Sequence, residues 1–267
     1  ATDNWMKETK PEVVFLAAAT VGGILANETL PAEFLFNNLA IETNVIHGAY
    51  KVGTKKLMFL GSNCTYPTKA TQPIVEESLL TGRLEPTNQW YAVAKIAGIK
   101  LCQAYRRQYG CNFVAVQPAS TYGPGDNFTE ESSHVISALM KKAHESKINK
   151  FESMHVWGTG EPLREYIYVD DLADALVFLM KFYSEEIHIN VGTGEEVSIS
   201  ALANLIVDVV GYRGKIEFDT LKPDGMKRKL LSSKSLKKLG WKPKTDLNHG
   251  LQKMYAWYLD TLTSNVG

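Results

Sequence analysis

The chain has 267 residues, of which 45% are hydrophobic and 22% charged, and its formal net charge at pH 7 is zero. This composition is typical of a globular protein with one large α/β domain, or with a domain and a smaller lobe. The charge balance gives no reason to expect a nucleic acid or a membrane as partner, and no run approaches the roughly 18–20 apolar residues that cross a bilayer. Three scattered cysteines without metal-ligand spacing favour a reducing, cytoplasmic setting and predict no metal site.

In chain order, the predicted elements alternate between strand and helix. The apolar run 12–19 predicts a parallel strand covered on both faces, and a helix of about 18 residues follows from Pro31. The later elements are predicted as a strand at 55–62, a helix at 89–109, a strand at 113–120, a helix at 132–146 with a serine N-cap, a strand leading into a helix at 164–183, and a strand at 187–192.

This alternation predicts a Rossmann-like, doubly wound parallel sheet with a smaller C-terminal α/β substrate lobe. The dinucleotide-binding domain is assigned to residues 1–122 and 165–192, and the lobe to residues 123–164 and 193–267. Only 11 residues precede the first predicted strand, and the chain contains no G-x-x-G-x-x-G or G-x-G-x-x-G motif. A bare parallel edge would favour aggregation, so we expect an N-terminal β-α-β segment to be missing from the sequence.

Two residues of the predicted helix 89–109 suggest hydride-transfer chemistry. Tyr91 and Lys95 are four residues apart, so their side chains share one helix face. A lysine ammonium near a phenol is expected to lower the pKa of Tyr91, which could then exchange a proton with a carbonyl oxygen. The same spacing also arises by chance in a chain rich in tyrosine and lysine. Ser62 favours the catalytic interpretation, because it ends a strand at the edge where doubly wound sheets bind ligands.

Longer motifs extend this pattern along the chain: LAAATVGGI, GSNCTYP, EPTNQWYAVAKIAGIKLC, YGPGDNF, SHVI, WGTGEPLREYIYVDD, INVGTG, KPDGMKRKLL and LGW. Through them, the chain from about residue 8 to its C-terminus resembles the GDP-L-fucose synthase family of extended short-chain dehydrogenase/reductases. The resemblance implies NADPH-dependent 3,5-epimerisation and 4-reduction of GDP-4-keto-6-deoxy-D-mannose to GDP-L-fucose. The alternatives are another nucleotide-sugar epimerase or reductase, and a non-catalytic GDP-sugar-binding remnant that lacks the cofactor loop.

The resemblance gives Cys64 and His134 roles in the epimerisation. Inversion next to a ketone needs one group that removes a proton and another that delivers a proton to the opposite face. A Cys64 thiolate can be the base, although a cysteine in this position could also be a small buried hydrophobic residue. His134, expected in the first turn of a helix after Ser132 and Ser133, would be the acid; the alternative is a surface histidine. The other five histidines (47, 144, 155, 188 and 249) are assigned to the surface.

The resemblance implies catalytic roles for Ser62, Cys64, Tyr91, Lys95 and His134. It places NADP (NADPH) against Leu60, Gly61, Ser62, Asn63, Tyr91, Lys95, Pro118, Ala119, Ser120, Thr121 and His134. It assigns the GDP-sugar to Lys142, Trp157, Arg164, Asp224 and Lys229, where cations would bind the diphosphate and an aromatic surface would pack against the nucleotide. Seen one at a time, each of these five would more often be a surface residue.

The helices at 31–50 and 89–109 also suggest a partner. Both carry apolar or small residues around more than one face, so each needs a second surface besides its own sheet. The family resemblance supplies that surface as a homodimer interface of four helices, two from each subunit.

Overall fold

The computed structural model describes residues 2–129, 133–222 and 224–264. The α-helices are α1 (Thr2–Thr9), α2 (Ile24–Thr29), α3 (Pro31–Lys51), α4 (Gln89–Tyr109), α5 (Val135–Ile148), α6 (Val169–Phe182), α7 (Ile199–Val210), α8 (Lys234–Lys238) and α9 (Leu247–Ser264). The strands are β1 (Val13–Leu16), β2 (Lys56–Leu60), β3 (Phe113–Pro118), β4 (Ser120–Tyr122), β5 (Ser153–Trp157), β6 (Leu163–Arg164), β7 (Tyr166–Tyr168), β8 (Ile189–Val191), β9 (Val197–Ser198), β10 (Lys215–Asp219) and β11 (Arg228–Lys229).

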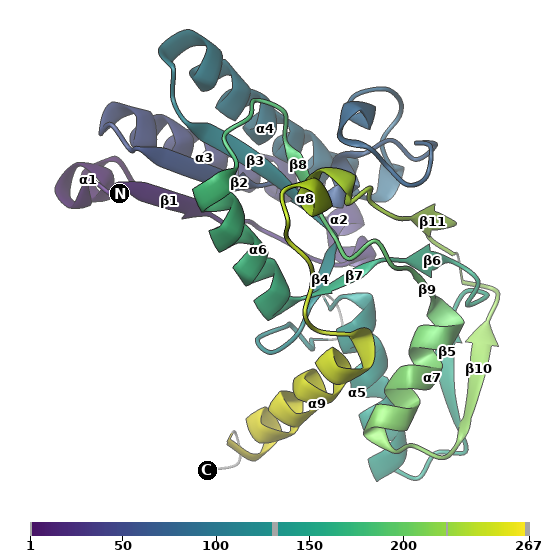
Figure 1. Cartoon of the computed structure of the whole chain (residues 1–267). Coiled ribbons are helices and arrows are strands. Elements are labelled where there is room, and N and C mark those ends of the chain that lie inside the picture. Colours follow the sequence, from purple (N-terminus) through teal and green to yellow (C-terminus); the bar gives the residue numbers. More distant parts are fainter. Residues whose placement is uncertain (1, 130–132, 223, 265–267) are drawn as a thin grey trace.

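Among the described residues, the central sheet has four parallel strands in the order β1-β2-β3-β8 (Figure 1). Helix α3 connects β1 to β2, and α4 connects β2 to β3, as expected of βαβ units. Helix α4 has the bounds that the sequence predicts, and it ends at Gly110, which adopts φ +70° and allows the left-handed C-cap. The predicted Rossmann-like, doubly wound architecture is therefore confirmed.

Alternate residues of the central strands pack against opposite layers of helices. Leu57 and Phe59 of β2 lie in a cluster with residues of α3 and α4, whereas Met58 lies in a cluster with residues of α6. All three side chains are completely buried. The near-continuous apolar strands follow from this, because a parallel sheet covered on both faces has no solvent-facing side.

The remaining elements form smaller sheets and a helical layer (Figure 1). Strand β10 pairs with β5, β4 pairs with β7, and β6 lies between β9 and β11. Helices α5, α7 and α9 enclose a second core with β5 and β7. Residues Leu231, Leu236 and Trp241, late in the chain, pack instead into the core of the central sheet, so the two predicted parts share packing. The exact boundaries between them stay a prediction.

Strand β1 differs from the sequence-based expectation. The run 12–19 predicts a strand buried on both faces, but β1 is the edge of the central sheet in the described part of the chain. Val13 is 46% exposed and Phe15 44%. Apolar composition alone cannot distinguish an edge strand from a central one, and the expected additional β-α-β segment stays a prediction. Within residues 2–129, 133–222 and 224–264, no helix is both long and apolar enough to span a bilayer.

Candidate active site

The carboxyl ends of β2 and β3 meet at one edge of the central sheet and bring two predicted segments together. Leu60 pairs in register with Val116, and the Gly61 amide donates to the Val116 carbonyl at 2.8 Å. Gln117, completely buried, accepts a hydrogen bond from the Ser62 amide at 2.5 Å. A Cβ on residue 61 would lie 2.2 Å from the Gln117 Oε1 atom, so only glycine fits there. The structure thus fixes the backbone that presents Ser62.

The second predicted cofactor segment follows β3 at the same edge. Pro118 pairs in register with Val191, and the Ala119 amide donates to the Val191 carbonyl at 2.8 Å. Ser120 and Thr121 then begin β4, which pairs with β7. Both predicted segments, 60–63 and 118–121, therefore lie at the carboxyl edge where ligands of doubly wound sheets bind.

Ser62 and Tyr91 lie close enough to act on one oxygen atom. Ser62 is the N-cap of the short 3-10 turn Asn63–Thr65, and its Oγ atom accepts a hydrogen bond from the Cys64 amide at 3.2 Å. Burial raises the pKa of Tyr91, the negative charges of Cys64 and Glu42 raise it further, and a hydrogen bond with the Ser62 side chain lowers it. The phenol is therefore a proton donor, and its hydroxyl lies next to a second hydroxyl.

The ammonium of Lys95 contacts a partner that the sequence did not predict. Its Nζ atom lies 3.2 Å from Oε1 of Glu42 on α3, and 5.9 Å from the centroid of the Tyr91 ring. Both charged side chains of the pair are at most 2% exposed. The ammonium of Lys95 is paired with Glu42, and burial raises the pKa of Tyr91, so the expectation of a lowered Tyr91 pKa is wrong for this structure.

The Cys64 sulfur lies among groups that donate to it. The side-chain amide of Asn88 donates to Sγ at 3.5 Å, and the Lys229 ammonium donates to Sγ at 3.8 Å. Lys229 also pairs in register with Arg164, since β11 and β6 are neighbours. Burial lowers the pKa of Arg164, and the charges of Tyr166, Asp224 and Cys64 raise it. The Cys64 thiol is half-buried, and it donates in turn to Oδ1 of Asn63 at 3.7 Å.

Two further predicted substrate residues lie side by side in the lobe. The Lys142 ammonium is 5.6 Å from the centroid of the Trp157 ring and donates to the His155 carbonyl at 3.1 Å. Trp157 is 62% exposed, and the Lys222 ammonium also lies 5.3 Å from the centroid of its ring. Asp224 accepts hydrogen bonds from the amide and hydroxyl of Thr159 at 2.9 and 2.8 Å, which gives this carboxylate a structural role.

The histidine predictions need correction. His134 is exposed and is the N-cap of α5, one position before the expected first turn, and its side chain accepts no capping hydrogen bond. The predicted serine N-cap is wrong, because His134 itself occupies the N-cap position of α5. His188, assigned to the surface, is 2% exposed, and its Nε2 atom is 2.9 Å from the Tyr66 hydroxyl. Whether His134 acts with Cys64 stays a prediction.

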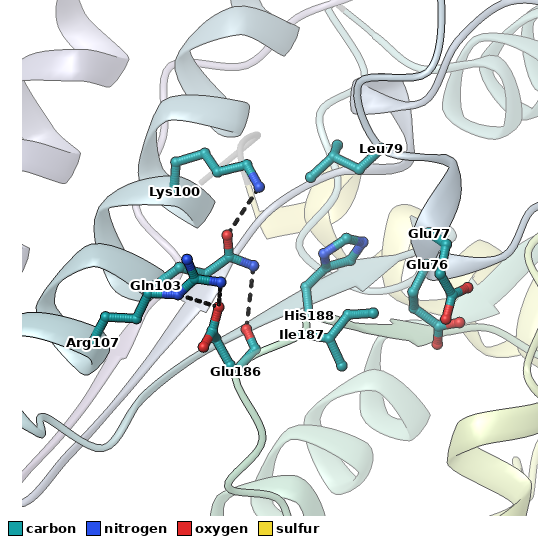
Figure 2. A pocket seen from close by; sticks show the side chains of 9 residues that line it. All are labelled: Glu76, Glu77, Leu79, Lys100, Gln103, Arg107, Glu186, Ile187 and His188. Atoms are coloured by element: carbon teal, nitrogen blue, oxygen red, sulfur yellow. Dashed lines mark hydrogen bonds and ion pairs between the residues drawn. The ribbon is translucent and has the colours of Figure 1, made fainter.

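A pocket of about 400 Å³ lies between α4 and the segment that precedes β8 (Figure 2). Its lining includes Lys100 and Arg107 of α4 together with Glu186, Ile187 and His188, which precede β8. Arg107 and Lys100 are directed toward partners within the pocket wall, Glu186 and Gln103. None of the predicted site residues lines it, so this pocket is separate from the candidate active site.

Comparison with known proteins identifies the family of the chain. The model of the NAD dependent epimerase/dehydratase family matches residues 1–192. The chain belongs to this family. GDP-L-fucose synthase of Sinorhizobium fredii is 55% identical over 263 residues, 98% of this chain and 84% of that relative. GDP-L-fucose synthase 1 of Arabidopsis thaliana is 56% identical over 257 residues, 96% of this chain and 80% of that relative. A solved structure of a GDP-L-fucose synthetase from Naegleria fowleri bound to NADP has a TM-score of 0.93 at 30% identity, and the match covers 99% of this chain and 81% of that structure.

The residues at the carboxyl edge fit the nicotinamide cofactor of the family. Tyr91 and Ser62 supply the hydroxyl donors that a carbonyl next to a hydride donor needs. Two buried polar atoms have no hydrogen-bond partner among the described residues: Oδ1 of Asn88, whose amide nitrogen donates to Cys64, and the hydroxyl of Tyr166, which lies near Arg164. Such atoms are costly unless a ligand or water satisfies them, which is consistent with a site for a hydroxyl-rich ligand.

Sequence reasoning did not identify Glu42 or Asn88 as site residues. Glu42 is one of several polar residues on α3, and its inward direction follows only from the packing of α3 on α4. Asn88 is part of the EPTNQWY motif, three residues before Tyr91, and that position was the available signal.

Proposed function

We propose that this chain is an NADPH-dependent enzyme that epimerises C3 and C5 of GDP-4-keto-6-deoxy-D-mannose and reduces C4 to give GDP-L-fucose. The observation that carries the proposal is the group formed by Ser62, Cys64, Tyr91 and Lys229 at the carboxyl edge of the sheet. The GDP-L-fucose synthases of Sinorhizobium fredii and Arabidopsis thaliana, each more than half identical to the chain, support the choice of substrate.

In the epimerisation, Cys64 removes the proton from C3 or C5. The electron pair of the broken C–H bond moves into an enolate, whose negative charge develops on the C4 oxygen. Tyr91 and Ser62 donate hydrogen bonds to that oxygen and stabilise the charge. His134 then delivers a proton to the opposite face of the carbon, which inverts its configuration without net oxidation or reduction.

In the reduction, Tyr91 gives its proton to the C4 oxygen. When bound, NADPH supplies the hydride that C4 receives. The Tyr91 phenolate that remains is stabilised by the Ser62 hydroxyl and the Lys95 ammonium, and it regains a proton from solvent before the next turnover. The cofactor would be held by residues 60–63 and 118–121, together with Tyr91, Lys95 and His134.

The nucleotide part of the substrate is held by the smaller lobe. Arg164 and Lys229 bind the diphosphate as adjacent cations, and Lys142 and Trp157 offer a charge and a ring for the rest of the nucleotide. Asp224 orients this region through Thr159.

We further propose that the enzyme is a cytoplasmic homodimer. Helices α3 and α4 pack side by side on the same face of the central sheet (Figure 1). Phe36 on α3 is 70% exposed and Val93 on α4 is 44% exposed, so apolar surface remains on both helices outside the sheet contact. A second copy of the chain offers a matching apolar surface through a two-fold axis.

The function is tested by incubating the protein with GDP-4-keto-6-deoxy-D-mannose and NADPH and separating the nucleotide sugars by chromatography. We expect GDP-L-fucose, with one NADPH oxidised per molecule formed and no reduced product when NADPH is omitted. Unchanged keto sugar, or a reduced sugar that keeps the configuration of the substrate at C3 and C5, would refute the proposal.

A further inference from the structure

A buried ion pair lies directly behind the candidate active site. Glu42 is on α3 and Lys95 on α4, and their charged atoms are 3.2 Å apart with side chains 1% and 2% exposed. Removing two charges from water is costly, and a buried pair of this kind often adds little or no stability compared with apolar residues. A contribution to folding stability is therefore a weak explanation for the presence of this ion pair.

Lys95 is the only ion-pair partner of Glu42 in the described part of the chain. Neither carboxylate oxygen has a hydrogen-bond partner of good geometry there. Gly98 makes room for it, because a Cβ at that position would lie 2.8 Å from Oε2. The titratable groups that face Glu42 are Lys95, Tyr91 and the thiol of Cys102, all on α4.

Lys95 depends on this carboxylate for its charge. Burial lowers the pKa of Lys95, and the neighbouring Glu42 raises it. On its other side, the ammonium lies 4.7 Å from the centroid of the Phe59 ring of β2, which is completely buried. A lysine in such apolar surroundings without an anion would tend toward the neutral amine, which cannot stabilise a phenolate.

We propose that Glu42 is a positioning residue for the reduction: its carboxylate holds the Lys95 side chain in place and keeps it protonated next to Tyr91. This inference rests on the proposed function, since reduction is the step in which Tyr91 loses its proton. Glu42 touches neither substrate nor the reacting atoms; it acts through Lys95. Burial raises the pKa of Glu42 to about 7, so the pair is fully ionised only above neutral pH.

The first test compares the wild-type protein with Glu42→Gln, a neutral side chain of the same shape. The titration of Lys95 is followed by NMR of ¹³C-labelled lysine without nucleotide, and the pH dependence of the reduction rate is measured separately. In Glu42→Gln we expect Lys95 to lose its proton at a pH lower by about one unit or more, and the alkaline fall in kcat to move with it. Glu42→Asp, which keeps the charge, should restore most of the shift.

Cys102→Ala is the matched control, because it alters packing next to Glu42 without removing the carboxylate; it should leave both titrations unchanged. Equal Lys95 titrations in wild type and Glu42→Gln would overturn the inference, and so would a shift of the same size in Cys102→Ala. If Glu42→Gln does not fold, the wild type decides: the Lys95 signal must change a second time as Glu42 takes up its proton near neutral pH. The NMR titration needs no substrate, so its result is independent of whether GDP-L-fucose is formed.

Discussion

At the scale of single residues, the hydrogen-bond donors around the Cys64 sulfur indicate its role more clearly than its burial does. A half-buried thiol would be unremarkable by itself, but Asn88 and Lys229 both direct N–H groups at its sulfur. An anionic sulfur is stabilised by such donors, and losing one hydrogen bond to a charged group costs about 1.5–3 kcal/mol. Asn88 is thus the residue whose removal isolates the contribution of one donor.

Asn88→Ala is expected to slow epimerisation about 10- to 100-fold, because the thiolate loses one of its donors. The measurement is the exchange of the C3 and C5 protons of the keto sugar with deuterated solvent. Gln89→Ala is the control: the Gln89 amide donates to the Pro86 carbonyl at 3.2 Å, so its loss leaves the Cys64 donors in place. Equal exchange rates in Asn88→Ala and wild type would exclude this role.

At the scale of elements, the sequence predicts the helices and strands that are marked by residues within or next to them. Helix α4 is predicted with its exact bounds, and α3 from its first residue, because apolar spacing and Pro31 mark them. Neighbouring carboxyl ends of strands follow from the βαβ order, so the meeting of segments 60–63 and 118–121 is also foreseeable. The edge position of β1 and the inward direction of Glu42 depend on tertiary contacts, which periodicity does not encode.

The outer faces of α3 and α4 give an element-scale prediction. Phe36→Asp should shift the protein from dimer toward monomer, because a carboxylate at a packed apolar interface is desolvated without a partner. Analytical ultracentrifugation measures the change against Phe151→Asp, an equally polar substitution at a 56% exposed phenylalanine of the smaller lobe. A wild type that is monomeric at all concentrations, or a dimer that Phe36→Asp leaves intact, contradicts the proposed interface.

At the scale of the whole molecule, the two packing layers bring distant parts of the chain to one site. The central sheet supplies Ser62 and Cys64 after β2, α4 supplies Tyr91, and β11, more than 130 residues later, supplies Lys229. The contact between Cys64 and Lys229 therefore joins the sheet to the smaller lobe. Family motifs in the sequence named all four residues, but their convergence required the structure.

The most direct test of this account is the product that Cys64→Ser forms in deuterated water with GDP-4-keto-6-deoxy-D-mannose and NADPH. Wild type and the control Cys111→Ser, which alters a half-buried cysteine packed at the edge of the α3–α4 core, should both give GDP-L-fucose with deuterium at C3 and C5. Cys64→Ser should bind nucleotide normally but give no GDP-L-fucose, and any sugar it reduces should keep its original configuration without deuterium. Deuterated GDP-L-fucose from Cys64→Ser at the wild-type rate would contradict the account.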